Sequence, residues 1–244
     1  MSILRGIINA IVFILVWQVI IFGFNLPVYI LPSPILVLTS FKTHGVLILQ
    51  QSLPTLIEAG VGMIISVILG TFWALILIYF RYLRLWFLPL LLVSQALPVF
   101  AIAPLLVIWF GYGVASKIAI TCLMLFFPIA SSFYDGLRHT PQCYLDLAQT
   151  MNASKWQILI RIRIPNALPS LSNGLRLAAT FAPMGAVIGE WVGSSQGLGF
   201  LILNANSRMQ IDLMFTIVLV LAILTLGFYY LIDFLMKHVV AKTI

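Results

Sequence analysis

Charged residues are scarce in this sequence. Asp, Glu, Lys and Arg make up only 8% of its 244 residues, whereas 62% are hydrophobic, and the mean hydropathy is +1.14. A soluble domain carries roughly 25% charged residues, with which it covers its surface. This chain has too few to face water on all sides, so the sequence predicts an integral membrane protein.

Cysteine and histidine are scarce as well. Cys122 and Cys143 show no metal-ligand spacing, and His44, His139 and His238 flank the apolar stretches instead of lying inside them. This pattern is typical neither of a disulfide framework nor of a zinc site. The net charge of +7 comes from thinly spread Lys and Arg without a basic run. We therefore expect no metal, no catalytic residue and no nucleic-acid partner.

Long apolar stretches are abundant, and a bilayer requires about 20 such residues per helix. They predict an all-α, polytopic membrane protein with a single transmembrane domain over residues 1–244 and about six transmembrane helices. The first is kept as a helix because NLPVYILPSP, which follows it, lacks the cleavage site of a signal peptide. The predicted spans are 7–24, 56–80, 85–109, 118–134, 174–192 and 214–236.

Prolines predict two irregular regions. Pro27, Pro32, Pro34 and Pro54 favour a loop over 25–55, with room for a short interfacial helix. The third span contains Pro89, Pro98 and Pro104 and must be kinked or broken, which lipid tolerates only where protein or water satisfies the freed backbone groups.

The basic residues predict the orientation. With the N-terminus inside, three basic residues (Lys42, Lys117 and Arg208) fall outside and the other ten inside. This positive-inside bias places both termini in the cytoplasm and the loops 25–55, 110–117 and 193–213 outside. The ten inside are Arg5, Arg81, Arg84, Arg138, Lys155, Arg161, Arg163, Arg176, Lys237 and Lys242.

The segment YLDLAQTMNASKWQILIRIRIPNALP, residues 144–169, is too polar to span a bilayer. Thr140 and Pro141 are typical of a helix start, and that helix can run through Met151. Asn152 tolerates the left-handed conformation that ends a helix. Ser154 can cap a second helix over 155–164, closed by Pro165 and Pro169.

The second helix is amphipathic, with Trp156, Leu159, Ile160 and Arg163 at helical spacing. Two interpretations fit this pattern: an interfacial helix that lies on anionic lipid, or a docking surface for a cytoplasmic protein. Composition alone does not separate them.

The spacing of this segment resembles the EAA loop of bacterial ABC importer permeases. That motif contains Glu, two small residues, Gly after three more, and Ile-x-Leu-Pro after a further nine. This sequence has Asp in place of Glu, Leu in place of the first Ala, Asn in place of Gly and Ile in place of Leu. Like Gly, Asn tolerates the left-handed conformation that ends a helix. Every spacing is kept, at Asp146, Leu147, Ala148, Asn152, Ile162, Ile164 and Pro165.

The resemblance covers roughly the whole chain. Residues 167–202 look like the branch that imports sulfonates, nitrate, taurine and thiamine pyrimidine precursors, and GEWVGSSQGLGF over 189–200 is most similar to permeases for hydroxymethylpyrimidine-type precursors. It implies a type I ABC importer permease fold in the bacterial inner membrane. The substrate implied is a thiamine pyrimidine precursor; the alternatives are aliphatic sulfonate, taurine or nitrate.

The same resemblance implies the partners. GYGVASKI, residues 111–118, lacks the Gly-Lys-Ser/Thr of a phosphate-binding loop, and its composition favours a turn. We therefore expect no cofactor on this chain, and ATP and Mg²⁺ on a separate ABC ATPase subunit. The other implied partners are a second permease copy, with which this chain forms a homodimer, an extracytoplasmic substrate-binding protein and membrane lipid. We name residues 140–169 the coupling segment; the residues implied to couple to the ATPase are Asp146, Leu147, Ala148, Asn152, Ala153, Trp156, Ile162, Ile164 and Pro165.

The solute pathway has two candidate residues. Glu190 is an acid inside a predicted span, which fits either a structural pair or a place near the pathway. Gln95 precedes the break at Pro98 and fits a pathway role or a polar contact between helices. Gly185, Gly189 and Gly193 favour close helix packing or a seam between two copies. The loop 193–213 is either the surface that meets the binding protein or a plain connector.

Two other protein classes fit less well. An intramembrane enzyme needs paired Asp, a Ser–His pair or HExxH in its spans, and none occurs. An ion-coupled secondary transporter normally has several buried ionisable groups and an internal repeat. Here we expect only Glu190 to lie clearly inside a span, and we find no repeat.

Overall fold

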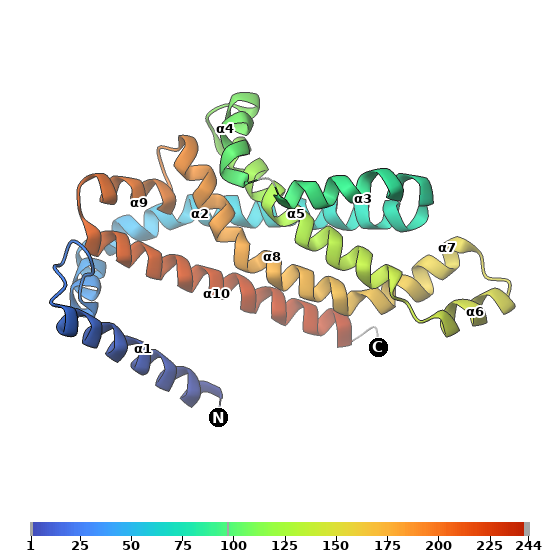
Figure 1. Cartoon of the computed structure of the whole chain (residues 1–244), viewed down its shortest axis with the longest axis horizontal. Coiled ribbons are helices and arrows are strands. Elements are labelled where there is room, and N and C mark those ends of the chain that lie inside the picture. Colours follow the sequence, from blue (N-terminus) through green and yellow to red (C-terminus); the bar gives the residue numbers. More distant parts are fainter. Residues whose placement is uncertain (1, 97, 242–244) are drawn as a thin grey trace.

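The structure, a computed structural model, describes residues 2–96 and 98–241, and all regular elements in these ranges are helical. Figure 1 shows an elongated bundle with α6 and α7 at one end and α9 at the other. In chain order, the elements are α1 (Ser2–Phe24), α2 (Pro34–Tyr79), α3 (Arg81–Ala96), α4 (Val99–Phe110), α5 (Val114–Arg138), α6 (Gln142–Thr150), α7 (Lys155–Ile158), the π-helical turn η1 (Leu159–Arg163), α8 (Ile164–Gly193), α9 (Leu198–Ser207) and α10 (Ile211–Ala241).

Within the described residues, α2, α5 and α10 are each long and apolar enough to cross a membrane. The stretch from Lys155 to Gly193 qualifies together with α9 as one broken span, bent by 55°. The chain is therefore a multi-pass membrane protein, and the count of six spans stays a prediction.

The predicted loop over 25–55 is wrong. Helix α2 already begins at Pro34, where Ser33 caps it by accepting a hydrogen bond from the Leu36 amide at 3.4 Å. The helix then continues through Pro54. A proline inside a helix removes one backbone bond, and a membrane helix tolerates this where its neighbours compensate.

The predicted break of the third span is confirmed. Helix α3 ends at Ala96 and α4 begins at Val99, with Pro98 in an extended conformation as its N-cap. Pro89 and Pro104 lie inside α3 and α4. The predicted span over 85–109 is thus two helices.

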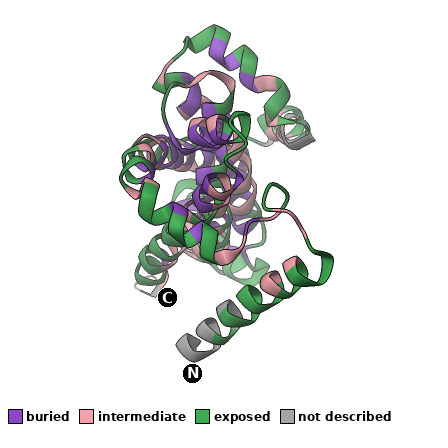
Figure 2. Ribbon diagram, turned by 90° about the vertical axis from the view of Figure 1, so that its left-hand side faces the viewer, coloured by how far each residue is buried: buried purple, intermediate pink, exposed green. Residues whose placement is uncertain are grey.

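The core lies where α5 packs between α2 and α8. Buried residues gather in the middle of the bundle, whereas the described side chains of α1 are mostly exposed (Figure 2). At Thr121, α5 makes close contacts with both neighbouring helices. A Cβ atom at Gly62 of α2 would lie 2.6 Å from Thr121 Cγ2, and one at Gly185 of α8 would lie 3.1 Å from Thr121 Cα. Glycine permits this approach because it has no side chain to displace the neighbouring helix.

The glycine repeat of α8 therefore serves packing within one chain. Gly185 faces Thr121, Gly189 faces Lys117 at 3.0 Å from its Cα, and Gly193 faces the ring of Tyr112 at 2.8 Å, each distance measured to a Cβ placed on the glycine. Close helix packing, the first of the two alternatives, is thus confirmed for these positions, and the seam between two copies stays a prediction.

Gly62→Ala tests this packing, with Gly60→Ala on the same helix as the matched control. The new methyl group at position 62 meets Thr121, whereas nothing lies within 4 Å of one at position 60. We expect Gly62→Ala to destabilise the bundle by about 1–3 kcal/mol and Gly60→Ala to be neutral or stabilising by up to ~1 kcal/mol. Thermal melting of the purified chain in detergent measures both, and equal melting temperatures for the two variants would contradict the contact.

Candidate functional site

The first half of the coupling segment is helix α6, which begins one residue later than predicted. Pro141 is its N-cap, without a side-chain bond, and Gln142 is its first residue. The predicted cap by Thr140 is wrong. Its hydroxyl instead donates to the carbonyl of Leu137 at 3.2 Å, because Thr140 lies directly behind the end of α5 and satisfies a terminal carbonyl there.

The predicted elbow at Asn152 is confirmed. Its φ is 57°, in the left-handed region. The Asn152 amide donates to Gln149 O and the Ala153 amide donates to Ala148 O, both at 2.9 Å. These two bonds form a Schellman motif, the helix end that Gly or Asn normally provides. The chain therefore turns sharply between α6 and α7.

The predicted cap at Ser154 is also confirmed. Ser154 Oγ accepts from the Gln157 amide at 3.3 Å, and Gln157 Oε1 accepts from the Ser154 amide at 2.8 Å. This reciprocal pair is a capping box, which fixes the direction in which α7 leaves the elbow.

The predicted end of the second helix at Pro165 and Pro169 is wrong. Helix α7 passes through η1, where the Ile164 amide reaches back five residues to Leu159 O, and continues directly as α8. A proline in the first turn of a helix needs no N–H partner, and the wider π turn accommodates the change of register. Arg163 Nη1 also donates to Leu137 O at 3.2 Å, so the start of α8 is tied to the end of α5.

A groove of about 820 Å³ lies between α6 and the elbow on one side and α7, η1 and the start of α8 on the other. Its α6 wall includes exposed apolar side chains, with Leu147 60% and Met151 74% exposed, and Ile162 and Pro165 on the opposite wall are half-buried. Leu145 and Leu159 point the other way and are buried. Six of the nine coupling candidates line the groove: Leu147, Ala148, Asn152, Ala153, Ile162 and Pro165.

The other three candidates lie outside the groove. Asp146 is exposed and accepts from Gln142 Nε2 at 2.9 Å. Trp156 is 60% exposed, with its ring centroid 6.4 Å from that of Tyr79. Ile164 is half-buried against the core.

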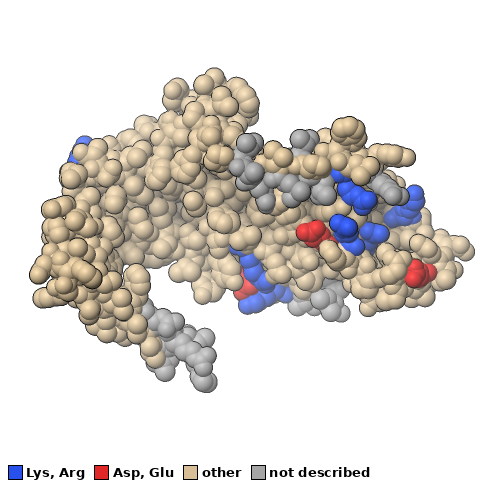
Figure 3. All heavy atoms as spheres, viewed as in Figure 1, with Lys and Arg blue, Asp and Glu red and all other residues tan. Residues whose placement is uncertain are grey.

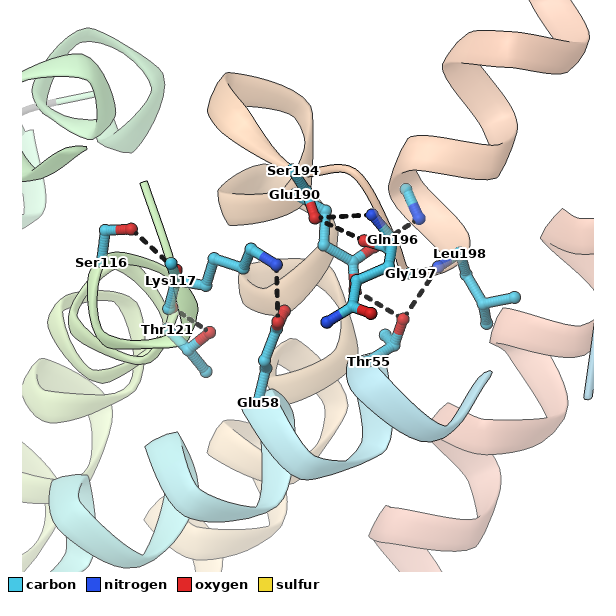
Figure 4. Close-up of polar contacts among 12 residues, drawn as sticks. Thr55, Glu58, Ser116, Lys117, Thr121, Glu190, Ser194, Gln196, Gly197 and Leu198 are labelled. Carbon is cyan, nitrogen blue, oxygen red and sulfur yellow. Dashed lines mark hydrogen bonds and ion pairs between the residues drawn. The ribbon is translucent and has the colours of Figure 1, made fainter. Parts of the chain in front are cut away.

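A second cluster of polar and charged side chains, drawn in Figure 4, surrounds the start of α9, the helix that lies at the end of the bundle opposite α6 and α7 (Figure 1). Lys117 Nζ of α5 donates to Glu58 Oε1 of α2 at 2.9 Å, and both side chains are at most 4% exposed. Lys117 was expected in an outer loop and instead lies in the first turns of α5, which begins at Val114 and not at 118. Only Gly111–Gly113 of the expected turn over 111–118 connects α4 to α5.

Glu190 caps helix α9. Its carboxylate accepts from the Thr55 hydroxyl at 2.6 Å and from the Gly199 amide at 2.5 Å. The Leu198 amide donates to Thr55 Oγ1 at 2.9 Å, and the Gly197 amide donates to Gln51 Oε1 at 2.6 Å. Negative charge at a helix N-terminus is stabilised by the unpaired amides there. Glu190 and α2 therefore hold the start of α9 in place.

Gly197 is required at this turn. Its φ is 107°, which a residue with a side chain rarely adopts, and a Cβ atom there would collide with the carboxylate of Glu190.

Sequence reasoning missed Glu58 and Asp233, both of which lie inside predicted spans. One signal could have indicated the ion pair of Glu58 and Lys117: the two residues have opposite charges and lie at the outer ends of two predicted spans. Asp233 lies at the other end of the bundle and pairs with Arg176 at 2.8 Å and Lys237 at 2.6 Å. Gln95 belongs to α3, but its side chain falls outside the described part of the chain, so its role stays a prediction. Among the described residues, no three His, Cys, Asp or Glu side chains group as metal ligands would.

Comparison with known proteins finds relatives along nearly the whole chain. The family model "Binding-protein-dependent transport system inner membrane component" matches residues 62–244. A "Probable ABC transporter permease protein" of Haemophilus influenzae is 48% identical over 93% of each chain. The formylaminopyrimidine transport permease ThiX of Halalkalibacterium halodurans is 40% identical over 70% of this chain and 69% of its own. A putative aliphatic sulfonates transport permease, SsuC of Bacillus subtilis, is 28% identical over 90% of this chain and 80% of its own.

The fold also has a solved counterpart. A chain of the MetNI methionine ABC transporter in an inward-facing conformation superimposes with a TM-score of 0.67 at 20% identity, over 83% of this chain and 99% of that one. The type I ABC importer permease fold expected from the sequence is therefore confirmed.

Glu190→Ala tests the cap of α9. Without the carboxylate, the Gly199 amide and the Thr55 hydroxyl lose their acceptor, and a buried polar group left unpaired costs about 1–3 kcal/mol. We expect amide hydrogens in 194–207 to exchange faster in hydrogen–deuterium exchange mass spectrometry. The control is Asp135→Ala, which removes an exposed carboxylate of α5. Unchanged exchange in Glu190→Ala would contradict the capping role.

Proposed function

The chain belongs to the binding-protein-dependent transport system inner membrane component family, whose model covers 183 of its 244 residues, and from this premise we propose that it works as follows. It is the permease subunit of an ABC importer. Its coupling segment docks on a separate ATPase subunit, which binds ATP and Mg²⁺, and its helical bundle forms the pathway for a small polar solute.

The exposed apolar groove of the coupling segment carries this proposal. Tyr144, Leu147 and Met151 fall on one face of α6 and are 49%, 60% and 74% exposed. Contiguous exposed apolar surface of this kind marks an interaction site. Because these side chains stand around a concave groove of about 820 Å³, they suit a protruding protein partner better than a flat lipid surface.

The distribution of charge supports the same orientation. On the face seen in Figure 3, Lys and Arg gather towards the end that carries α6 to α8, and most of the remaining described surface is uncharged. Positive charge concentrates on the cytoplasmic side of membrane proteins. We therefore assign the coupling segment and both termini to the cytoplasm and the α9 end to the extracytoplasmic side of a bacterial inner membrane.

Helix α8 supplies the mechanical link. It continues from η1 of the coupling segment without interruption to Gly193, and its Glu190 caps α9. The bond from Arg163 to Leu137 O joins it to α5 at the cytoplasmic end. Movement imposed on α6 and α7 by the ATPase therefore reaches both helices of the core.

The remaining partners follow from the family. A second copy of the permease, as a homodimer, shares the pathway with this chain, and a substrate-binding protein delivers the solute to the extracytoplasmic end, where the loop after Gly193 is exposed. Lipid covers the apolar sides of the bundle, where α10 exposes residues such as Ile223 and Phe234.

The solute is a thiamine pyrimidine precursor in this proposal. The 40% identical relative is named for formylaminopyrimidine transport, and this supports the assignment. Aliphatic sulfonate, taurine or nitrate is the second candidate, supported by the 28% identical relative named for sulfonates.

Leu147→Glu tests the docking surface. A charge at the exposed apolar wall of the groove disfavours burial against the ATPase, and an unpaired interface charge costs several kcal/mol. We expect at least a tenfold loss of the ATPase subunit that copurifies with the permease, measured by quantitative gel analysis of the membrane-extracted complex.

Gln149→Glu is the matched control, since it introduces the same residue on α6 at an exposed position that does not line the groove. It should copurify the ATPase at the wild-type level. Undiminished copurification and ATP hydrolysis with Leu147→Glu, or uptake by the permease alone driven by a proton or sodium gradient, would overturn the proposal.

A further inference from the structure

A pocket lies between α8 and α10, at the end of the bundle that carries α6 and α7. It forms where the start of α8 meets the end of α10, two segments that run side by side (Figure 1). Its volume is about 310 Å³, within the ~300–1,000 Å³ range of small-ligand sites. The described residues that line it include two cations and no acid: Pro169, Ser172, Asn173, Arg176, Met236, Lys237 and Val240.

Asp233 holds the two cations together from outside the lining of the pocket. Its Oδ1 atom accepts from Arg176 Nε at 2.8 Å, and its Oδ2 atom lies 2.6 Å from Lys237 Nζ. Arg176 Nη1 also donates to Asn173 Oδ1 at 3.0 Å, which fixes the guanidinium group from a second side. Because one carboxylate faces two cations, the group keeps one positive charge that it does not neutralise itself.

The two cations also keep unused hydrogen-bond donors. An arginine side chain has five N–H donors and a lysine three. The structure shows two bonds from Arg176 and one from Lys237. The Lys237 side chain is 68% exposed and that of Arg176 27%, so a ligand can reach both. A guanidinium and an ammonium group that converge in this way suit the oxygens of a phosphate group.

The surroundings of the pocket favour a lipid as the source of that phosphate. Arg176 and Lys237 lie at the ends of the predicted spans 174–192 and 214–236, where lipid headgroups meet water. Deeper along the two helices, α8 exposes Leu177 and Phe181 and α10 exposes Phe234. These apolar side chains can pack against acyl chains, whereas a soluble anion would gain nothing from them. Basic pockets between transmembrane helices on the cytoplasmic side are a known kind of site for anionic headgroups.

We propose that Arg176, Lys237 and Asn173 form a binding site for the phosphodiester headgroup of an anionic phospholipid. Arg176 and Lys237 donate to the phosphate oxygens, and the amide nitrogen of Asn173 adds a donor at the rim. A zwitterionic headgroup binds more weakly, because it brings a cation of its own to a site that is already positive. The inference requires only that the chain spans a membrane and does not depend on the importer function.

Native mass spectrometry of the full-length chain, released from detergent micelles, tests the site because it counts bound lipid molecules. The probes are dioleoylphosphatidylglycerol and dioleoylphosphatidylcholine, which share their acyl chains and differ in headgroup charge. We expect the wild-type chain to bind one phosphatidylglycerol at least tenfold more tightly than phosphatidylcholine. Lys237→Gln should raise the Kd for phosphatidylglycerol about fivefold, since one basic residue near an anionic lipid surface contributes about that much.

Lys155→Gln is the matched control for this variant. It removes the same charge from an exposed position at the same end of the bundle, and Lys155 does not line the pocket. Its Kd for phosphatidylglycerol should equal that of the wild type. Equal increases in Lys237→Gln and Lys155→Gln would show general attraction between charges and would overturn the site.

Asn173→Asp provides a second variant that keeps both cations. Asn173 is exposed, and the new carboxylate can still accept from Arg176 while it repels a phosphate. We expect at least a tenfold rise in the Kd for phosphatidylglycerol, because like charges in contact are strongly unfavourable. Asn206→Asp, the same change at an exposed position of α9, should leave the Kd unchanged.

Three further results would contradict the proposal. Equal affinity of the wild-type chain for the two lipids, or unchanged binding in Asn173→Asp, would overturn the headgroup site. Displacement of phosphatidylglycerol by an excess of inorganic phosphate would overturn the lipid as its ligand, because it would show that a free anion occupies the pocket equally well.

Discussion

The contact of Thr121 with two glycines is the constraint on which the rest of the molecule depends. Gly62 and Gly185 let α2 and α8 approach α5 from two sides until backbone and side chain touch. This contact fixes the spacing of three helices at one level of the bundle. The ion pair of Glu58 and Lys117 forms on one side of that level, and the coupling segment lies beyond the other. Both functional ends therefore belong to a single packed unit.

Lipid supplies no hydrogen bonds, so buried polar groups in this bundle must find partners within the protein. Glu190 shows how this requirement shapes the fold. Its carboxylate satisfies two donors that would otherwise be unpaired, one from α2 and one from α9. The same bonds hold the bend between α8 and α9 in one position. A side chain that sequence reasoning treats as a pathway candidate thus also determines where a helix begins.

Local signals were readable from the sequence, and long-range pairing was not. Asn152 and Ser154 act within a few residues of themselves, so their capping roles were predictable. Pro54 and Pro165 were misjudged because a proline ends a helix only when its surroundings fail to compensate. Neither the packing around Pro54 nor the π turn before Pro165 is evident from a proline alone. Glu58 and Lys117 are 59 residues apart, and only the packing of α2 on α5 brings them within 2.9 Å.

The π turn has a geometric consequence. Because it joins α7 to α8 without a break, the chain from Lys155 to Gly193 is one continuous helical rod that begins directly after the elbow at Asn152. The 30 residues of α8 alone span about 45 Å at 1.5 Å per residue. A tilt of ~5° at one end would displace the other by about 4 Å over that length. A small tilt at one end of α8 would thus move the Glu190 carboxylate, which caps α9, at the other end.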